Sequence, residues 1–278
     1  MKFTKMQGIG NDYVYVNCFE ETVADPAAAA VYVSDRHFGI GSDGLVLIMP
    51  SQTADCRMRM FNSDGTESEM CGNAIRCVAK YVYDRDIIHK RQLSVETLAG
   101  IKYIAINTDD NDIARTMTVD MGAPITEAAQ VPVTAKSSPV TDLRLSAFGR
   151  EFIFTCVSMG NPHAVTFISE DVSRFEVERY GKVFEVDEHF PHRSNIEFAE
   201  VLSPTHLKMR VWERGAGETL ACGTGTCAAV AAACLNGICP REPVTVDLLG
   251  GKLTIEWSAK DGHIYMTGPA EFVFDGEI

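Results

Sequence analysis

Met70 to Ala74 of this chain read Met-Cys-Gly-Asn-Ala, and a second stretch, Ala221 to Gly225, reads Ala-Cys-Gly-Thr-Gly. In both stretches small residues follow the cysteine, and a helix-like run follows them. The pattern predicts that Cys71 and Cys222 each lie just ahead of a helix N-terminus, where unpaired N–H groups and the helix dipole favour negative charge. A thiol in that position loses its proton more easily, and a carboxylate can bind the same N–H groups. Two cysteines at matched positions suggest a paired acid and base.

The sequence around the two stretches repeats at an almost constant offset. Met58 to Phe61 corresponds to Met209 to Trp212, and the Cys-Gly pair at Cys71 corresponds to the pair at Cys222, in both cases 151 residues later. Other matches occur in the same order, with offsets of about 150 to 152 residues. Ordered matches of this kind indicate a duplicated unit, and hence two similar domains related by pseudo-two-fold symmetry.

The local pattern within each half is mostly β-strand, with one longer helix after each cysteine. We expect these helices over residues 74–83 and 226–235, and the second is so apolar that it must be buried. The predicted fold class is therefore α+β, with each domain a curled, mostly antiparallel sheet wrapped around a central helix. We expect an N-terminal domain over residues 1–117, completed by a C-terminal strand over residues 264–278. The C-terminal domain then spans residues 118–263.

Composition excludes several classes of function. A formal charge of −13 would repel a phosphate backbone, so we expect no nucleic-acid partner. No apolar run approaches the roughly 20 residues that span a bilayer, and Met1 to Thr4 do not begin a signal peptide, so we expect a cytoplasmic protein without a membrane partner. Nine cysteines without an export signal argue against a disulfide scaffold, and their spacing is a poor match to a metal site.

If the two halves face each other, both predicted helix N-termini meet at one cleft. The α-carboxylate of an amino acid would then bind the N–H groups near Gly72-Asn73 and Gly223-Thr224. One thiolate would remove the α-proton and the other thiol would return a proton to the opposite face. The stereocentre would be inverted without a cofactor, provided that the helix ends stabilise the carbanion charge.

Seven motifs occur in order along the chain, namely Gly10 to Asp12, Phe61 to Gly65, Met70 to Cys77, Gly160 to His163, Ser194 to Ile196, Trp212 to Thr219 and Ala221 to Gly225. The last two form one long string, which includes Trp-Glu-Arg-Gly-Ala-Gly-Glu-Thr and is highly specific. Together the motifs resemble the diaminopimelate epimerase family, from about residue 1 to Gly276. The resemblance implies a homodimeric, pyridoxal-phosphate-independent enzyme that interconverts LL- and meso-2,6-diaminopimelate in lysine and peptidoglycan synthesis.

The resemblance also implies roles for individual residues. Cys71 and Cys222 match the catalytic pair, and the paired helix starts match the site of the reacting carboxylate. His163 and Glu213 match a pair that tunes the pKa of the thiols. The substrate-contacting positions correspond to Asn11, Asn62, Asn161, Asn195, Glu213 and Arg214. The chain departs from some relatives at Gly44, where they carry a substrate-contacting Gln.

Simpler interpretations remain for some of these residues. Asn62 fits a turn ahead of Asp64-Gly65, Asn11 and Asn161 fit loop caps, and His163 fits a satisfied buried histidine. Two other functions also remain. A proline or hydroxyproline racemase uses the same pair of cysteines, although it usually has histidine where this chain has Asn73. A thiol redox protein would instead join Cys71 and Cys222 in a disulfide.

Overall fold

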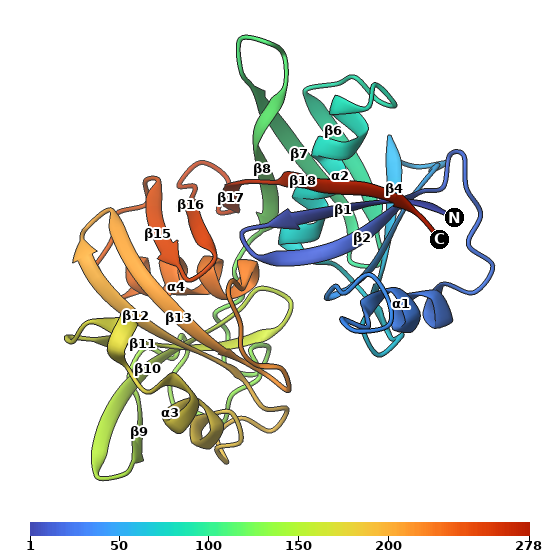
Figure 1. The fold of residues 1–278 in the computed structure, drawn as a ribbon. Helices are drawn as coiled ribbons and strands as arrows, with labels where there is room; N and C mark the ends of the chain where they lie inside the picture. The colour runs from blue at the N-terminus through green and yellow to red at the C-terminus, as the bar shows by residue number, and fades with distance from the viewer. The chain divides into compact units, whose positions relative to one another are not determined.

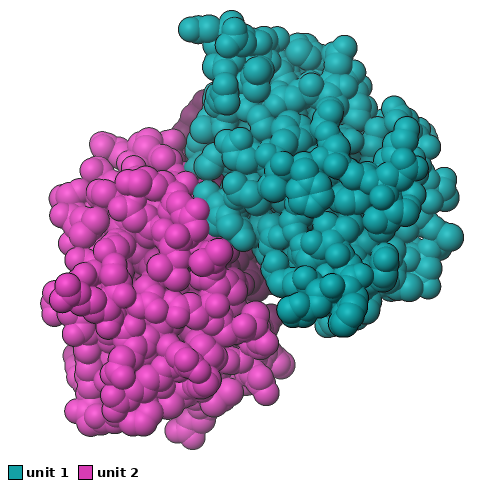
Figure 2. All heavy atoms as spheres, viewed as in Figure 1, with its two compact units in different colours: residues 1–120, 267–278 teal, residues 121–266 magenta.

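Two compact units make up the chain in the computed structural model, which describes residues 1–278. Unit 1 comprises residues 1–120 and 267–278, and unit 2 comprises residues 121–266 (Figure 2). The chain changes unit at 120/121 and 266/267, against 117/118 and 263/264 in the sequence analysis. Each unit combines a sheet with helices (Figure 1), which confirms the α+β class.

Unit 1 is a sheet of short strands around one long helix. The β1 strand pairs antiparallel with both β2 and β18, β2 runs parallel to β3, and β3 pairs antiparallel with β4. The sheet continues with β6 parallel to β4 and with β7 antiparallel to β6. The elements are β1 (Lys2–Gly8), β2 (Asn11–Asn17), α1 (Pro26–Ser34), β3 (Gly44–Met49), β4 (Cys56–Asn62), β5 (Glu67–Ser68), α2 (Gly72–Asp84), β6 (Gln92–Thr97), β7 (Gly100–Thr108), β8 (Ala114–Gly122) and β18 (Glu271–Glu277).

Unit 2 repeats this order of strand pairings. The β10 strand is antiparallel to β11, β11 parallel to β12, β12 antiparallel to β13, β13 parallel to β15 and β15 antiparallel to β16. This agreement supports the duplication inferred from sequence. The elements are β9 (Leu143–Ala147), β10 (Arg150–Ser158), β11 (Pro162–Ile168), η1 (Val172–Arg174), α3 (Val177–Phe184), β12 (Asn195–Ser203), β13 (His206–Glu213), β14 (Gly217–Glu218), α4 (Gly223–Leu235), β15 (Val244–Leu248), β16 (Gly251–Trp257) and β17 (Ile264–Pro269), along which the chain returns to unit 1.

The predicted central helices exist, and each begins earlier than the sequence pattern indicated. The α2 helix begins at Gly72 and α4 at Gly223, so Cys71 and Cys222 are their N-cap residues. Both helices have 13 residues. After α4, Gly237 has a φ of +68°, the left-handed conformation that commonly ends a helix at glycine. None of the helices is both long enough and apolar enough to cross a bilayer.

The two central helices differ in the chemistry of their buried surfaces. The α4 helix is buried through a run of small residues, which lets it pack closely against β10, β11, β12 and β16. The α2 helix is equally buried although it carries Arg76 and Lys80. Lys80 donates to Asp84 (2.8 Å) and to the carbonyl of Ala114 (2.6 Å). A buried charge is tolerated when it is paired and hydrogen-bonded in this way.

Candidate active site

Cys71 lies at the junction of the β5–α2 connection and the first turn of α2. Its backbone is extended (φ −131°, ψ 123°), and its carbonyl accepts the first helical hydrogen bond from Ile75 N (3.0 Å). The half-buried sulfur donates to Asn11 Oδ1 at 3.3 Å. The structure therefore brings together two residues that the sequence analysis placed at the site and that lie 60 positions apart.

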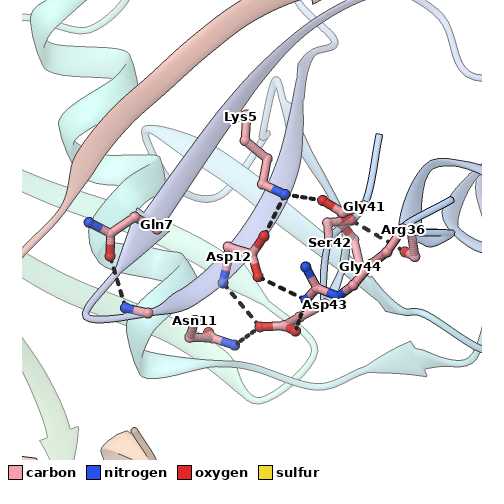
Figure 3. Close-up of polar contacts among 11 residues, drawn as sticks. Lys5, Gln7, Asn11, Asp12, Arg36, Gly41, Ser42, Asp43 and Gly44 are labelled. Carbon is pink, nitrogen blue, oxygen red and sulfur yellow. Dashed lines mark hydrogen bonds and ion pairs between the residues drawn. The ribbon is translucent and has the colours of Figure 1, made fainter. Parts of the chain in front are cut away.

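Asn11 begins β2 and belongs to a polar cluster at the end of the β1–β2 hairpin (Figure 3). Its side-chain nitrogen donates to Asp43 Oδ2 (2.9 Å), and the same oxygen accepts from Asp12 N (3.0 Å). Asp43 lies in the segment just before β3, beside Arg36, whose guanidinium is 3.3 Å from Asp43 Oδ1. Asn11 is thus held by side-chain contacts on both sides.

The first turn of α2 is buried and lies next to the positive charge of a buried arginine. Asn73 is 2% exposed, and Arg76 is fully buried one turn further along. The Arg76 guanidinium donates to the Gly72 carbonyl (3.1 Å) and to the Pro269 carbonyl (3.1 Å). Arg76 adds a fixed cation near helix N–H groups that already favour an anion.

Asn62 ends β4 next to a turn, and Gly44 begins β3. Asn62 ends β4 and donates to Thr66 Oγ1 (2.9 Å), inside a turn that contains Gly65 with a φ of +85°. No side chain fits at Gly44 as the backbone stands, because a Cβ there would collide with the carbonyl oxygen of Phe61. The Thr66 contact fits the turn interpretation of Asn62, and position 44 supplies no side-chain contact.

Cys222 is more deeply buried than Cys71, with 6% of its surface exposed. Its sulfur accepts from Gly225 N (3.4 Å) and lies 3.5 Å from Thr224 Oγ1. Burial, followed by the carboxylates of Glu213 and Glu197, raises the pKa of the Cys222 thiol well above its ordinary value, and the Thr224 and Gly225 donors oppose this only in part. The expectation that the helix N-terminus lowers the thiol pKa is therefore wrong for Cys222, because desolvation and two nearby anions outweigh the helix end.

His163 and Glu197 form a fully buried pair beside Cys222. His163 Nδ1 lies 2.7 Å from Glu197 Oε1, and its Nε2 lies 3.0 Å from Asn161 Oδ1. Burial raises the pKa of the Glu197 carboxyl, against the lowering effect of His163. A Cβ at Gly225 would lie 2.7 Å from Glu197 Oε1 and 3.3 Å from the Cys222 sulfur, so the carboxylate and the thiol approach the same point on α4.

Asn195, Glu213 and Arg214 gather where β12 begins and β13 ends. Asn195 donates to the Pro162 carbonyl (2.7 Å), and its side-chain oxygen accepts from Arg214 N (2.9 Å). The Arg214 guanidinium donates to the His192 carbonyl (3.0 Å). Glu213 accepts a hydrogen bond from the Thr219 hydroxyl. Asn195 therefore fixes the backbone from which the Arg214 side chain projects.

Three residues that contact predicted site residues of their own unit were missed by the sequence analysis, namely Asp43, Arg76 and Glu197. For Asp43 a signal existed, because the internal repeat aligns Ser42-Asp43 with Ser194-Asn195, and Asn195 was predicted to be at the site. Arg76 lay inside a quoted motif, and Glu197 directly follows one. Neither spacing nor periodicity showed that these charges are buried.

We expect the Glu213→Gln variant to have a lower Cys222 pKa, because the substitution removes one of the two carboxylates that raise it. The measurement is a pH titration by NMR of protein labelled with carbon-13 at the cysteine Cβ, which distinguishes thiol from thiolate. Glu218→Gln is the matched control, since Glu218 is bound instead to Arg210 (2.6 Å). A Cys222 midpoint that stays in place or rises in the Glu213 variant would contradict the assignment.

The sequence of this chain is similar to those of one family along almost its whole length. The sequence model of the family described as diaminopimelate epimerase matches residues 3–127 and 155–273. Diaminopimelate epimerases of Acetivibrio thermocellus and Methanococcus maripaludis are 58% and 56% identical to this chain, over all of it and over 98% and 99% of their own lengths.

Solved structures with much lower identity share the fold. A PhzF-family phenazine biosynthesis protein of Bacillus anthracis superposes with a TM-score of 0.73 at 18% identity, covering 100% of this chain and 98% of its own. A hydroxyproline epimerase of Agrobacterium vitis superposes with a TM-score of 0.67 at 13% identity, covering 100% and 90%.

Proposed function

This chain is a member of the diaminopimelate epimerase family, and we propose that it interconverts LL- and meso-2,6-diaminopimelate with two thiols and no organic cofactor. One structural observation carries the mechanism. Cys71 and Cys222 occupy the same position in two repeated units, each as the N-cap of a 13-residue helix. This arrangement gives each sulfur a neighbouring set of N–H donors for an anion.

The proton transfers balance without a further reagent. One cysteine, as thiolate, takes the α-proton, so that a C–H bond breaks and an S–H bond forms. The other cysteine, as thiol, gives its proton to the opposite face of the α-carbon. The pair ends with one proton in total, as it began, with acid and base exchanged.

The main energetic difficulty is the negative charge that develops on the substrate when the α-proton leaves. We assign the N–H groups of Gly72-Asn73 and Gly223-Thr224 to the reacting carboxylate, where fixed donors need no reorganisation. Buried Arg76 adds positive charge close to the first of these pairs. Loss of one such donor typically costs about 2.7–4 kcal/mol of transition-state stabilisation.

We assign recognition of the distal end of the substrate to polar residues of both units. The Arg214 guanidinium suits a carboxylate, which it can bind through two parallel hydrogen bonds. The remaining contacts are assigned to Asn11, Asn62, Asn161, Asn195 and Glu213. His163 and Glu213 tune the thiol pKa, and the Glu197 carboxylate acts with them through His163.

We also propose that the protein is a cytoplasmic homodimer. Val273, Phe274 and Ile278 are 48–54% exposed apolar side chains on or next to β18, a surface that a second copy would cover. Light scattering with size exclusion at micromolar concentration tests the oligomeric state. A monomer at all accessible concentrations would contradict this assignment.

We expect purified protein in deuterium oxide to place deuterium at the α-carbon of LL-diaminopimelate while the meso isomer appears, as followed by proton NMR. L-proline is the control substrate, and we expect no exchange on it, because it has no distal group for Arg214. Exchange on proline with none on diaminopimelate would favour a proline racemase. Oxidation of thiols with no exchange on either compound would favour a redox protein.

A further inference from the structure

Asn11 bridges Cys71 and a carboxylate that the family roles above do not include. The Asn11 carbonyl oxygen lies 3.3 Å from the Cys71 sulfur, and its amide nitrogen lies 2.9 Å from Asp43 Oδ2. Figure 3 shows the second of these contacts, with Asp43 directed at the amide nitrogen of Asn11. The two ends of one amide therefore have different partners.

An asparagine amide can in general bind in two orientations, because one end donates and the other accepts. A carboxylate is an acceptor alone, so Asp43 accepts the NH₂ end and leaves the carbonyl end for the sulfur. We propose that Asp43 is a positioning residue that holds the carbonyl oxygen of Asn11 toward the sulfur of Cys71. An amide turned the other way would present N–H donors to the sulfur instead.

Asp43 is itself held by contacts from two segments of unit 1, the start of β2 and the segment after α1 (Figure 3). Its Oδ2 accepts from the backbone of Asp12, and Arg36 lies 3.3 Å from its Oδ1. Lys5, which is 6% exposed, forms an ion pair with Asp12 and donates to the Gly41 carbonyl, two residues before Asp43. Lys5 thus ties the segment that carries Asp43 to the β1–β2 hairpin that carries Asn11.

The internal repeat also supports this assignment. The repeat pairs Asp43 with Asn195, and Asn11 with Asn161. In unit 2, Asn195 joins segments that carry site residues, through Pro162 and Arg214. In unit 1, Asp43 joins Asn11 and the backbone of Asp12. Asp43 immediately precedes β3 and Asn195 begins β12, which is the corresponding strand of the repeat. Each residue holds neighbouring loops in place.

The orientation of Asn11 has a consequence for the charge on Cys71. A carbonyl oxygen accepts the S–H hydrogen and so favours the thiol, whereas an N–H donor would favour the thiolate. The titratable groups near Cys71 on the neighbouring elements are Tyr15 on β2 and Cys77 on α2, whose pKa values are raised, in the case of Cys77 to about 11, so both are neutral at pH 7. The charged groups behind Asn11 are Asp43 with its partners Asp12 and Arg36, and Lys5 beyond them. On α2 itself, the buried guanidinium of Arg76 is a fixed cation bound to the Gly72 carbonyl.

The test is the pH dependence of Cys71 alkylation by iodoacetamide, read peptide by peptide by mass spectrometry. In D43N, an amide replaces the carboxylate and can offer either end to Asn11. We expect the midpoint of the Cys71 alkylation profile to move to lower pH and the alkylation rate at pH 7 to rise about twofold to fivefold. This is the effect of one hydrogen bond, partly offset because a thiolate of lower pKa is intrinsically less nucleophilic. A midpoint that is unchanged or higher would overturn the proposal. If D43N unfolds below the assay temperature, D43S replaces it, and the same shift of the Cys71 alkylation midpoint to lower pH is expected.

Two further variants separate positioning from a through-space effect of charge. In an N11A background the Asn11 amide is absent, so D43N should shift the Cys71 alkylation midpoint by at most half as much as it does in the wild-type background. An undiminished shift of that midpoint would overturn the proposal. R36Q is the matched control, since it alters the charge beside Asp43 but keeps the Asn11 contact. We expect R36Q to move the midpoint slightly upward, and a downward shift as large as that of D43N would count against the proposal.

This inference rests on the proposed function only in treating Cys71 as a reactive thiol. Alkylation requires no substrate, so the measurement stands whether or not α-hydrogen exchange on diaminopimelate is found. Exchange with no response of Cys71 to D43N would reject the positioning role and keep the enzyme. The opposite result would keep the positioning role and reject the enzyme.

Discussion

Replacing either Cys71 or Cys222 by serine is expected to lower kcat for epimerisation by about 10²- to 10⁴-fold, the contribution of one positioned acid–base group. Serine keeps the shape of the side chain, but its hydroxyl is a far weaker acid than a thiol and supplies no base near neutral pH. The measurement is the rate of interconversion of LL- and meso-diaminopimelate by the purified variants, with circular dichroism to verify the fold.

The two single variants also separate the two-base mechanism from a general loss of structure. A variant with one working thiol should still remove and return the α-proton on one face, giving slow deuterium exchange with retention in one isomer. The matched controls are Cys77→Ser and Cys227→Ser, buried cysteines in the same two helices. Near-normal turnover in both Cys71→Ser and Cys222→Ser, or equal losses in the controls, would contradict the assignment.

Arg214→Met should lower kcat/KM for diaminopimelate by about 10- to 150-fold, which corresponds to the 1.5–3 kcal/mol of a typical hydrogen bond to a charged group. Most of the effect should be a rise in KM, because the distal carboxylate is bound equally in the ground and transition states. Steady-state kinetics of the variant, with KM and kcat determined separately, measure this. The structural reason is that Asn195 and the His192 carbonyl already fix Arg214, which limits the entropy lost on binding.

Arg193→Met provides the control for the same change of charge in a neighbouring segment. Arg193 is exposed and pairs loosely with Glu185 (3.4 Å), so its loss should leave KM almost unchanged. Arg214→Lys should lie between the two, since an ammonium keeps the charge but not the paired geometry of a guanidinium. A fall in kcat with unchanged KM in Arg214→Met would place this residue at the reacting centre and contradict the distal assignment.

Several properties followed from sequence because they are local. Small residues after Cys71 and Cys222, and then helix-forming runs, place each cysteine at a helix start, and the structure confirms both as N-caps. The residues from Thr97 to Gly100 and from Leu248 to Gly251 are typical of hairpin turns, and each stretch joins two antiparallel strands in the structure. The run from Ala27 to Arg36, just after Pro26, predicts a further helix. In the structure this helix, α1, ends at Ser34 because Asp35 leaves the helical conformation.

The exposure of two cysteines was not predicted correctly. Residue type alone predicts that Cys18, Cys56, Cys156, Cys234 and Cys239 are small buried hydrophobes. Cys56, Cys156 and Cys239 are buried, but Cys18 and Cys234 are partly exposed. Burial depends on which elements cover a position, and residue type by itself gives only an average tendency.

The sequence by itself determined the duplication, the α+β class, the family and the two cysteine-capped helices, because each depends on patterns of neighbouring residues or on their repetition along the chain. The tertiary structure alone decided which distant side chains meet. Asp43 contacts Asn11 across 32 positions and Glu197 contacts His163 across 34, while Arg76 reaches Pro269 across 193. Burial likewise reversed the expected shift of the Cys222 pKa. The electrostatics of a thiol depend on solvent exclusion and on charges brought close by folding, and no local pattern encodes either of them.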